Sequence, residues 1–209
     1  MELIRSITIH RSMACLILDN GEKYWLSRKD LAEGGYQEGQ ETDPESLKRF
    51  VLLHQYRSAL DRAVAMLARR PCSNGEIEQK LRQAHFSEQT IEMVRYKLER
   101  EHLLDDHSFT DQWVQYRVSH QYGPRRIYQE LRQKGISEEI AENALNEVEE
   151  TDQSEQAVAL ALKLLRRSKK DEEPNKVRQR VISAMIRRGY SWEQAKEAFL
   201  DAQRQDSDS

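Results

Sequence analysis

The strongest constraint on the fold of this chain is an internal repeat. The segment 77–88, IEQKLRQAHFSE, aligns without a gap on the segment 127–138, IYQELRQKGISE, and seven of the twelve positions are identical. A weaker third copy, VISAMIRRGYSW, occupies residues 181–192. The copies begin 50 and then 54 residues apart. Because this period is too long for a pair of short helices, it predicts tandem modules of three helices each.

The middle copy shows how one module is built. Asp106 precedes an apolar helix face and is predicted to be the N-cap of the first helix. Gly123 and Pro124 then interrupt the chain, and proline is favoured in the first turn of a new helix. Gly135 is predicted to end that second helix in the left-handed conformation, and Ser137 is predicted to cap the third helix.

The N-terminal residues follow a different pattern. An Asn20-Gly21 pair separates two β-prone runs within residues 2–27. Such a pair is a strong signal for a β-hairpin, so we expect a small antiparallel sheet of two or three strands. Residues 28–33 are expected to add one helical turn.

Two stretches of the helical part are less regular. A helix is predicted to begin at Pro44, after the capping residue Asp43, and no strong helix breaker follows before Pro71. The sequence leaves open whether this is one long helix or two helices joined near residues 54–58. In the third module, the stretch 169–176, KKDEEPNK, is predicted to be an exposed loop.

The expected fold is therefore mainly α, with three tandem three-helix repeats in an elongated, curved array and a small N-terminal β-hairpin sheet in front of them. Each repeat is expected to bury its apolar face against its neighbours. The expected domains are a β-hairpin extension at 1–42, a leading helix with the first repeat at 43–106, the second repeat at 107–151, the third repeat at 152–203 and a disordered tail at 204–209.

Cysteine usage and hydropathy indicate a cytoplasmic protein. The two cysteines, Cys15 and Cys72, show no metal-ligand spacing. A disulfide between them stays open, but two free thiols in a reducing compartment is the simpler interpretation. The N-terminus lacks the continuous apolar run of a signal peptide, and the most apolar helix, near residues 157–165, is too short to cross a bilayer. No membrane partner is expected.

The charges are segregated although they nearly cancel, with a formal net charge of -3. Residues 107–151 carry five Lys and Arg against eight Asp and Glu, whereas residues 152–202 carry eleven against eight. Within the middle module the basic residues lie in the first two predicted helices and the acidic ones crowd the third. This pattern predicts a basic side and an acidic side.

Nothing in the sequence indicates catalysis. His102 and His107 flank Asp105 and Asp106, but proximity in sequence does not show that ligands converge, and aspartates are expected as caps in such a turn. The chain has no phosphate-binding loop, no nucleophile-elbow motif and no zinc-protease motif. We therefore expect a protein that is not an enzyme, with no catalytic residue, cofactor, metal or small-molecule substrate.

Basic side chains in the middle module are interleaved with aromatic ones, a combination that suits phosphates and stacked bases. The candidate contacts with a partner or with DNA are Arg117, Tyr122, Arg125, Arg126, Arg132 and Lys134 in that module, and Arg166 and Arg167 after the apolar helix of the third. The alternative for the aromatic residues is that Trp113 and Tyr128 occupy core positions of their helices.

Arg125 and Arg126 stand at the start of a predicted helix, where positive side chains oppose the helix dipole. A sequence optimised for stability alone favours acidic residues there. The pair therefore suggests a surface that binds an anion, either a DNA phosphate or a carboxylate of a protein partner. The alternative is that one arginine pairs with a neighbouring acidic residue such as Glu130.

The motif of the middle module resembles the signature of the RecX family, the regulators of the RecA recombinase. The residues that carry the resemblance are Asp105, Asp106, Phe109, Trp113 and Arg117, followed by Gly123, Pro124, Arg126, Ile127, Glu130, Leu131, Lys134, Gly135 and Ile136. The first module is similar to that family's first repeat at Leu67, Arg70, Ser73 and Leu81. The resemblance covers about residues 58–202, and the third repeat matches only in outline.

This resemblance implies a bacterial, non-enzymatic protein of DNA repair, homologous recombination and the SOS response. Members of the family bind the RecA nucleoprotein filament on single-stranded DNA, lie in its helical groove, and depress filament growth, ATP hydrolysis and strand exchange. The alternative is a free-standing helical DNA-binding regulator, since three-helix units with short turns also resemble helix-turn-helix readers. The net charge does not favour a simple DNA binder.

Overall fold

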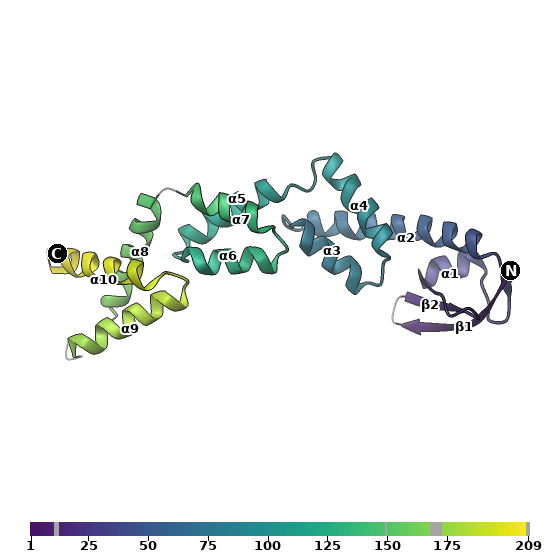
Figure 1. Cartoon of the computed structure of the whole chain (residues 1–209), viewed down its shortest axis with the longest axis horizontal. Helices are drawn as coiled ribbons and strands as arrows, with labels where there is room; N and C mark the ends of the chain where they lie inside the picture. Colours follow the sequence, from purple (N-terminus) through teal and green to yellow (C-terminus); the bar gives the residue numbers. More distant parts are fainter. Residues whose placement is uncertain (11–12, 149, 168–172, 208–209) are drawn as a thin grey trace. The chain divides into compact units, whose positions relative to one another are not determined.

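The computed structural model (Figure 1) describes residues 1–10, 13–148, 150–167 and 173–207. The chain forms two compact units, Met1–Leu104 and Asp105–Ser209. The first unit contains β1 (Glu2–His10), β2 (Met13–Leu18), β3 (Lys23–Ser27), α1 (Arg28–Gly34), β4 (Glu41–Thr42), α2 (Pro44–Leu67), α3 (Asn74–Gln83) and α4 (Glu88–Arg100). The second unit contains α5 (Asp106–Ser119), α6 (Pro124–Gln133), α7 (Glu138–Asn146), α8 (Glu150–Leu165), α9 (Pro174–Arg187) and α10 (Trp192–Ser207).

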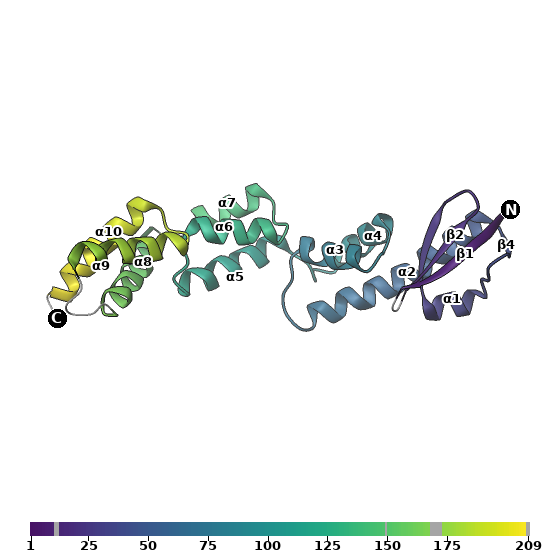
Figure 2. The same ribbon diagram turned by 90° about the horizontal axis from the view of Figure 1, so that it is seen from below.

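The helices of the described residues confirm the predicted modules. The helices α2, α3 and α4 form the first, α5, α6 and α7 the second, and α8, α9 and α10 the third, with separate apolar cores. Figure 2 shows α8, α9 and α10 packed together. Leu81 and Leu131 occupy equivalent positions of the repeat and are both fully buried. No helix formed by the described residues is long and apolar enough to cross a bilayer.

The N-terminal sheet contains the predicted hairpin and is larger than expected. Its strand order is β3-β2-β1-β4, all antiparallel. At the hairpin the backbone N–H of Leu18 donates to the carbonyl of Glu22 at 3.0 Å, and Gly21 has a φ of 89°. The expectation of two or three strands is wrong because β4 also pairs with β1. A strand of two residues is too short for its alternation to be recognised in the sequence.

One long helix joins the sheet to the first module, which resolves the open alternative for residues 44–67. The first half of α2 packs on the sheet through Leu47 and Val51. At its middle the buried Gln55 side chain donates to the carbonyl of Trp25 in β3 at 2.6 Å. The side-chain oxygen of Gln55 also accepts a bond from the backbone N–H of Ser87 at 3.0 Å. A single amide thus connects the sheet with the start of α4.

The turns between helices follow the predicted caps, with one correction. The predicted left-handed Gly135 has a φ of 80°, and Ser137 caps α7. The N-cap of α5 is Asp105 rather than Asp106, since the Asp105 carboxylate accepts bonds from the backbone N–H groups of His107 and Ser108 at 2.9 and 3.1 Å. Two adjacent aspartates offer the same chemistry, so the sequence does not distinguish them.

The ends of the third module differ from the expectation. Helix α10 continues to Ser207, so a disordered tail from residue 204 is wrong for residues 204–207, where Arg204 pairs with Asp201 at 3.1 Å. Residues 208–209 lie outside the described part of the chain. Half of the loop expected at 169–176, residues 169–172, lies outside it as well, and the expectation is wrong for residues 174–176 because α9 already begins at Pro174. Both cysteines lie in the first unit and are buried, and neither forms a disulfide with a described residue.

Candidate partner-binding surface

The second and third modules are joined by backbone hydrogen bonds at the start of α6. The backbone N–H of Gly123 donates to the carbonyl of Arg188 at 2.9 Å, and that of Arg125 donates to the carbonyl of Gly189 at 3.1 Å. Gly189 lies in the turn between α9 and α10 and has a φ of 97°. This contact brings the arginines at the start of α6 close to the arginines at the end of α9.

Three guanidinium groups gather around the ring of Tyr122. The guanidinium carbons of Arg117, Arg126 and Arg188 lie 4.0, 4.8 and 5.3 Å from the ring centre. Cations at such distances are attracted by the negative face of an aromatic ring. Tyr122, half-buried, therefore organises a cluster of positive charge, which we call the Tyr122 cluster.

Two of these arginines share one carboxylate. Arg117 binds both carboxylate oxygens of Glu130, with its Nε 2.6 Å from Oε2, and the Nε of Arg126 lies 3.1 Å from Oε1. Burial raises the pKa of Glu130, but the hydrogen bonds from Arg117 and Arg126 outweigh it, so the pKa lies below its usual value. The alternative interpretation of the arginine pair, in which one arginine forms an ion pair with Glu130, is therefore correct for Arg126. Arg117 pairs with the same carboxylate.

Arg125 and Arg187 are different. Both are exposed, and the side chain of neither makes a hydrogen bond or an ion pair with any residue that the structure describes. They line a shallow groove of about 340 Å³ between α6 and α9. Its other lining residues are Arg126, Gln129, Glu130, Gln133, Ile186, Gly189 and Tyr190. This α6–α9 groove presents polar side chains and two available guanidinium groups to solvent.

The remaining candidates do not line this groove. Arg132 donates to the carbonyl of Ile136 at 2.6 Å and so closes the end of α6. The ammonium group of Lys134 lies 4.1 Å from the ring centre of Trp113, which packs half-buried against the core of its module together with Tyr128.

Arg166, at the end of α8, pairs with Asp206 of α10 at 3.1 Å. Its exposed neighbour Arg167 does not line the groove either. The structure therefore brings together Arg117, Tyr122, Arg125 and Arg126, half of the eight predicted residues.

Sequence reasoning missed Arg187 and Arg188. Their signal is the doubled arginine before Gly189 in the third copy of the repeat, where the second copy has Gln133 and Lys134 before Gly135. The doubled arginine becomes informative only when one knows that the turn at Gly189, in the third module, packs on the start of α6 in the second module. Helical periodicity within one module contains no such information.

The described residues contain one group of three side chains with metal-ligating atoms close together, Asp30, Glu33 and His54 in the first unit. It does not include His102 or His107, the histidines considered from the sequence.

Comparisons with known proteins give a consistent result. Models for the first, second and third three-helix domains of RecX match residues 59–98, 105–145 and 150–199. The chain is 37% identical over 137 residues to a protein named regulatory protein RecX from Prosthecochloris aestuarii, covering 64% of this chain and 86% of that one. It is 34% identical over 132 residues to a protein of the same name from Mycobacterium sp. strain JLS, covering 60% and 71%.

Solved structures show the same similarity. A crystal structure of regulatory protein RecX superimposes with a TM-score of 0.65 and 26% identity, covering 96% of this chain and all of that one. The structure of RecX from Lactobacillus salivarius, at 24% identity and a TM-score of 0.64, covers 71% of this chain and 97% of its own and shares the fold.

Proposed function

This chain belongs to the RecX family of regulatory proteins, and from that premise we propose that it is a negative regulator of the RecA recombinase. In this proposal the protein binds the RecA filament on single-stranded DNA and inhibits its ATP hydrolysis, its growth and strand exchange. It acts in the cytoplasm, in DNA repair by homologous recombination and in the SOS response, and has no turnover of its own.

The observation that carries the proposal is the α6–α9 groove. Arg125 and Arg187 come from two modules and are held close together by the backbone contact of Gly123 with Arg188. Neither forms a hydrogen bond or an ion pair with a described carboxylate, although Arg125 lies close enough to Glu193 to interact with its charge, so each guanidinium is available to a phosphate or carboxylate oxygen. Beside them, the Tyr122 cluster adds three more arginines, two of which, Arg117 and Arg126, share the half-buried carboxylate of Glu130.

The arrangement favours recognition of an extended anionic surface over binding of a small molecule. The groove is shallow and polar, whereas small-molecule sites are mostly apolar and enclosed. A nucleoprotein filament offers phosphates and acidic side chains at regular intervals, so several weak contacts from successive modules can add up to high avidity. The candidates outside the groove, Arg166 and Arg167 among them, would supply such additional contacts.

The alternative is a free-standing DNA-binding regulator, which needs no RecA. The two functions predict different results in one titration of the purified protein. We expect it to slow ATP hydrolysis by RecA on single-stranded DNA at substoichiometric amounts and to bind duplex DNA weakly when RecA is absent. Tight duplex binding without RecA, together with unchanged ATP hydrolysis, would establish the alternative.

A further inference from the structure

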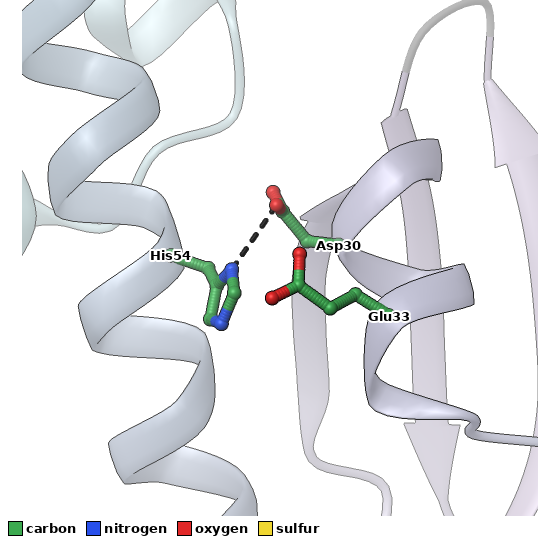
Figure 3. A group of neighbouring side chains, drawn as sticks. All are labelled: Asp30, Glu33 and His54. Carbon is green, nitrogen blue, oxygen red and sulfur yellow. Dashed lines mark hydrogen bonds and ion pairs between the residues drawn. The ribbon is translucent and has the colours of Figure 1, made fainter.

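Three side chains with metal-ligating atoms face one another between α1 and α2 (Figure 3). Asp30 and Glu33 come from α1, one helical turn apart, and His54 comes from the middle of α2. One ligand atom from each of the three lies within 4.8 Å of the other two. The group belongs to the first unit and has no part in the α6–α9 groove.

Two of the three side chains are already oriented. Asp30 is 8% exposed, and its Oδ2 accepts a hydrogen bond from the hydroxyl of Ser27 at 2.6 Å. Its Oδ1 lies 3.1 Å from Nδ1 of His54. The imidazole ring stacks on Phe50 with the ring centres 4.1 Å apart. A bond to a carboxylate ligand and a fixed imidazole plane are the kind of outer-shell support that metal sites have.

Glu33 is the residue that packing does not explain. Its carboxylate points toward the same imidazole that Asp30 contacts (Figure 3). It makes no hydrogen bond or ion pair with any described residue, and no described lysine or arginine pairs with Asp30 or Glu33. Two carboxylates that share a site repel each other unless a positive charge lies between them. A bound cation would supply that charge.

We propose that Asp30, Glu33 and His54 bind a divalent transition ion of the Zn²⁺ type. One imidazole nitrogen and two carboxylate oxygens suit such an ion, with water in the remaining position. Tetrahedral Zn²⁺ places its ligand atoms about 3.4 Å from one another. The ion connects α1, and through it the N-terminal sheet, to the long helix α2.

Ordinary packing makes a different prediction from metal binding. If the Asp30–His54 hydrogen bond only holds α1 on α2, the exposed Glu33 is dispensable. If the group binds an ion, Glu33 is a ligand, and the change Glu33→Gln removes a charge from the site without disturbing a hydrogen bond. Glu41→Gln provides the matched control, since Glu41 is an exposed glutamate of the same unit outside the group.

The test uses the full chain freed of metal by a chelator. Isothermal titration with Zn²⁺ should show about one tight site per chain, and Zn²⁺ should raise the melting temperature. Glu33→Gln should weaken the affinity by about 10–100-fold and abolish the melting shift, while the metal-free melting temperature stays unchanged or rises slightly because the repulsion between the two carboxylates is relieved. His54→Gln should remove the site, Glu41→Gln should bind as the parent does, and Co²⁺ should give the visible absorption of a tetrahedral ion.

Two results would overturn the proposal. One is a parent protein that takes up no Zn²⁺ above the level of His54→Gln. The other is a Glu33→Gln variant that binds Zn²⁺ as tightly as the parent. Neither result bears on the regulation of RecA, because the site and the α6–α9 groove lie in different units.

Discussion

A Cβ atom added to Gly123 would lie 2.4 Å from the carbonyl carbon of Gly189 and equally close to the backbone nitrogen of Tyr190. The start of α6 therefore passes directly against the turn between α9 and α10, at a distance that only two glycines allow. The Gly123-Pro124 pair separates α5 from α6 and also has a role in packing between modules. It lets the second module dock on the third, and this docking places Arg125 beside Arg187.

Gly123→Ala should therefore destabilise the joint between these modules. Because these neighbours of the added Cβ are backbone atoms of Gly189 and Tyr190, they cannot rotate away, and overpacking of this kind costs about 1–3 kcal/mol. Chemical denaturation followed by circular dichroism measures the loss. Gln115→Ala, an exposed position on α5, is the control and should change little. A Gly123→Ala protein as stable as the parent would mean that the joint is looser than the 2.4 Å contact implies.

The equivalence of Leu81 and Leu131 gives a second prediction. Both are fully buried at the same position of the repeat, in the cores of the first and second modules. Replacing either by Ala should lower the free energy of unfolding by about 2–5 kcal/mol. The two variants should be similar within that range, as judged from urea denaturation. A loss below about 1 kcal/mol at either position would contradict its place in a packed core.

Glu130 should make stability depend on pH. Its pKa is lowered in the folded protein by Arg117 and Arg126, against the effect of burial. Its ionised form thus contributes stability above the ordinary pKa of a glutamate, and this contribution is lost as the pH falls through the lowered value. At neutral pH Glu130→Gln should cost about 1–3 kcal/mol.

Melting temperatures measured from neutral pH down to about pH 3 test this assignment. The difference between the parent and Glu130→Gln should shrink on acidification. Glu142→Gln, an exposed change on α7, should behave like the parent over the whole range. If the difference in melting temperature between the parent and Glu130→Gln stays constant with pH, the charge of Glu130 is not the source of its contribution to stability.

Tyr122 should act through its ring rather than its hydroxyl group. Tyr122→Phe keeps the aromatic face on which Arg117, Arg126 and Arg188 lie, and it should preserve both stability and inhibition of RecA. Tyr122→Leu removes that face and should cost about 0.5–2 kcal/mol of stability, with weaker inhibition. If Tyr122→Phe and Tyr122→Leu have the same stability and inhibit ATP hydrolysis equally, the aromatic ring of Tyr122 does not hold the arginines of the Tyr122 cluster in place.

Local features of the fold could be predicted because they depend on neighbouring residues. The equivalence of the buried Leu81 and Leu131 follows from the repeat, and the cap at Ser137 and the left-handed Gly135 follow from turn chemistry. Even so, His85 adopts the same left-handed turn, with a φ of 64°, where a glycine is normally expected. Its ring stacks on Trp25 of β3 at 4.2 Å, a contact that no local pattern reveals.

The candidate surface could be predicted only in part, because some of its residues are brought together by contacts between modules that no local pattern reveals. Arg125 is recognisable from its unfavourable place at a helix start, which is a local property. Its partner in the groove, Arg187, is brought there by the backbone contact of Gly123 with the next module. Arg126 forms an i,i+4 ion pair with Glu130 within α6, which is the alternative that the sequence itself offers, and the packing of α5 on α6 brings Arg117 to the same carboxylate. Charge-reversal experiments should therefore use Arg125 with Arg187.

The most direct test of the proposed function is ATP hydrolysis by RecA on single-stranded DNA in the presence of the double variant Arg125→Glu, Arg187→Glu. Both side chains are exposed, so the variant should fold as the parent does by circular dichroism. The control is Arg57→Glu, Arg62→Glu, which makes the same change of charge on exposed positions of α2.

We predict that the groove variant inhibits less than the parent and that its filament binding depends less steeply on salt, because fewer anionic contacts are formed. The control variant should inhibit as the parent does. A folded groove variant that inhibits RecA with the potency and salt dependence of the parent would contradict the assignment of the α6–α9 groove as the surface that binds the filament.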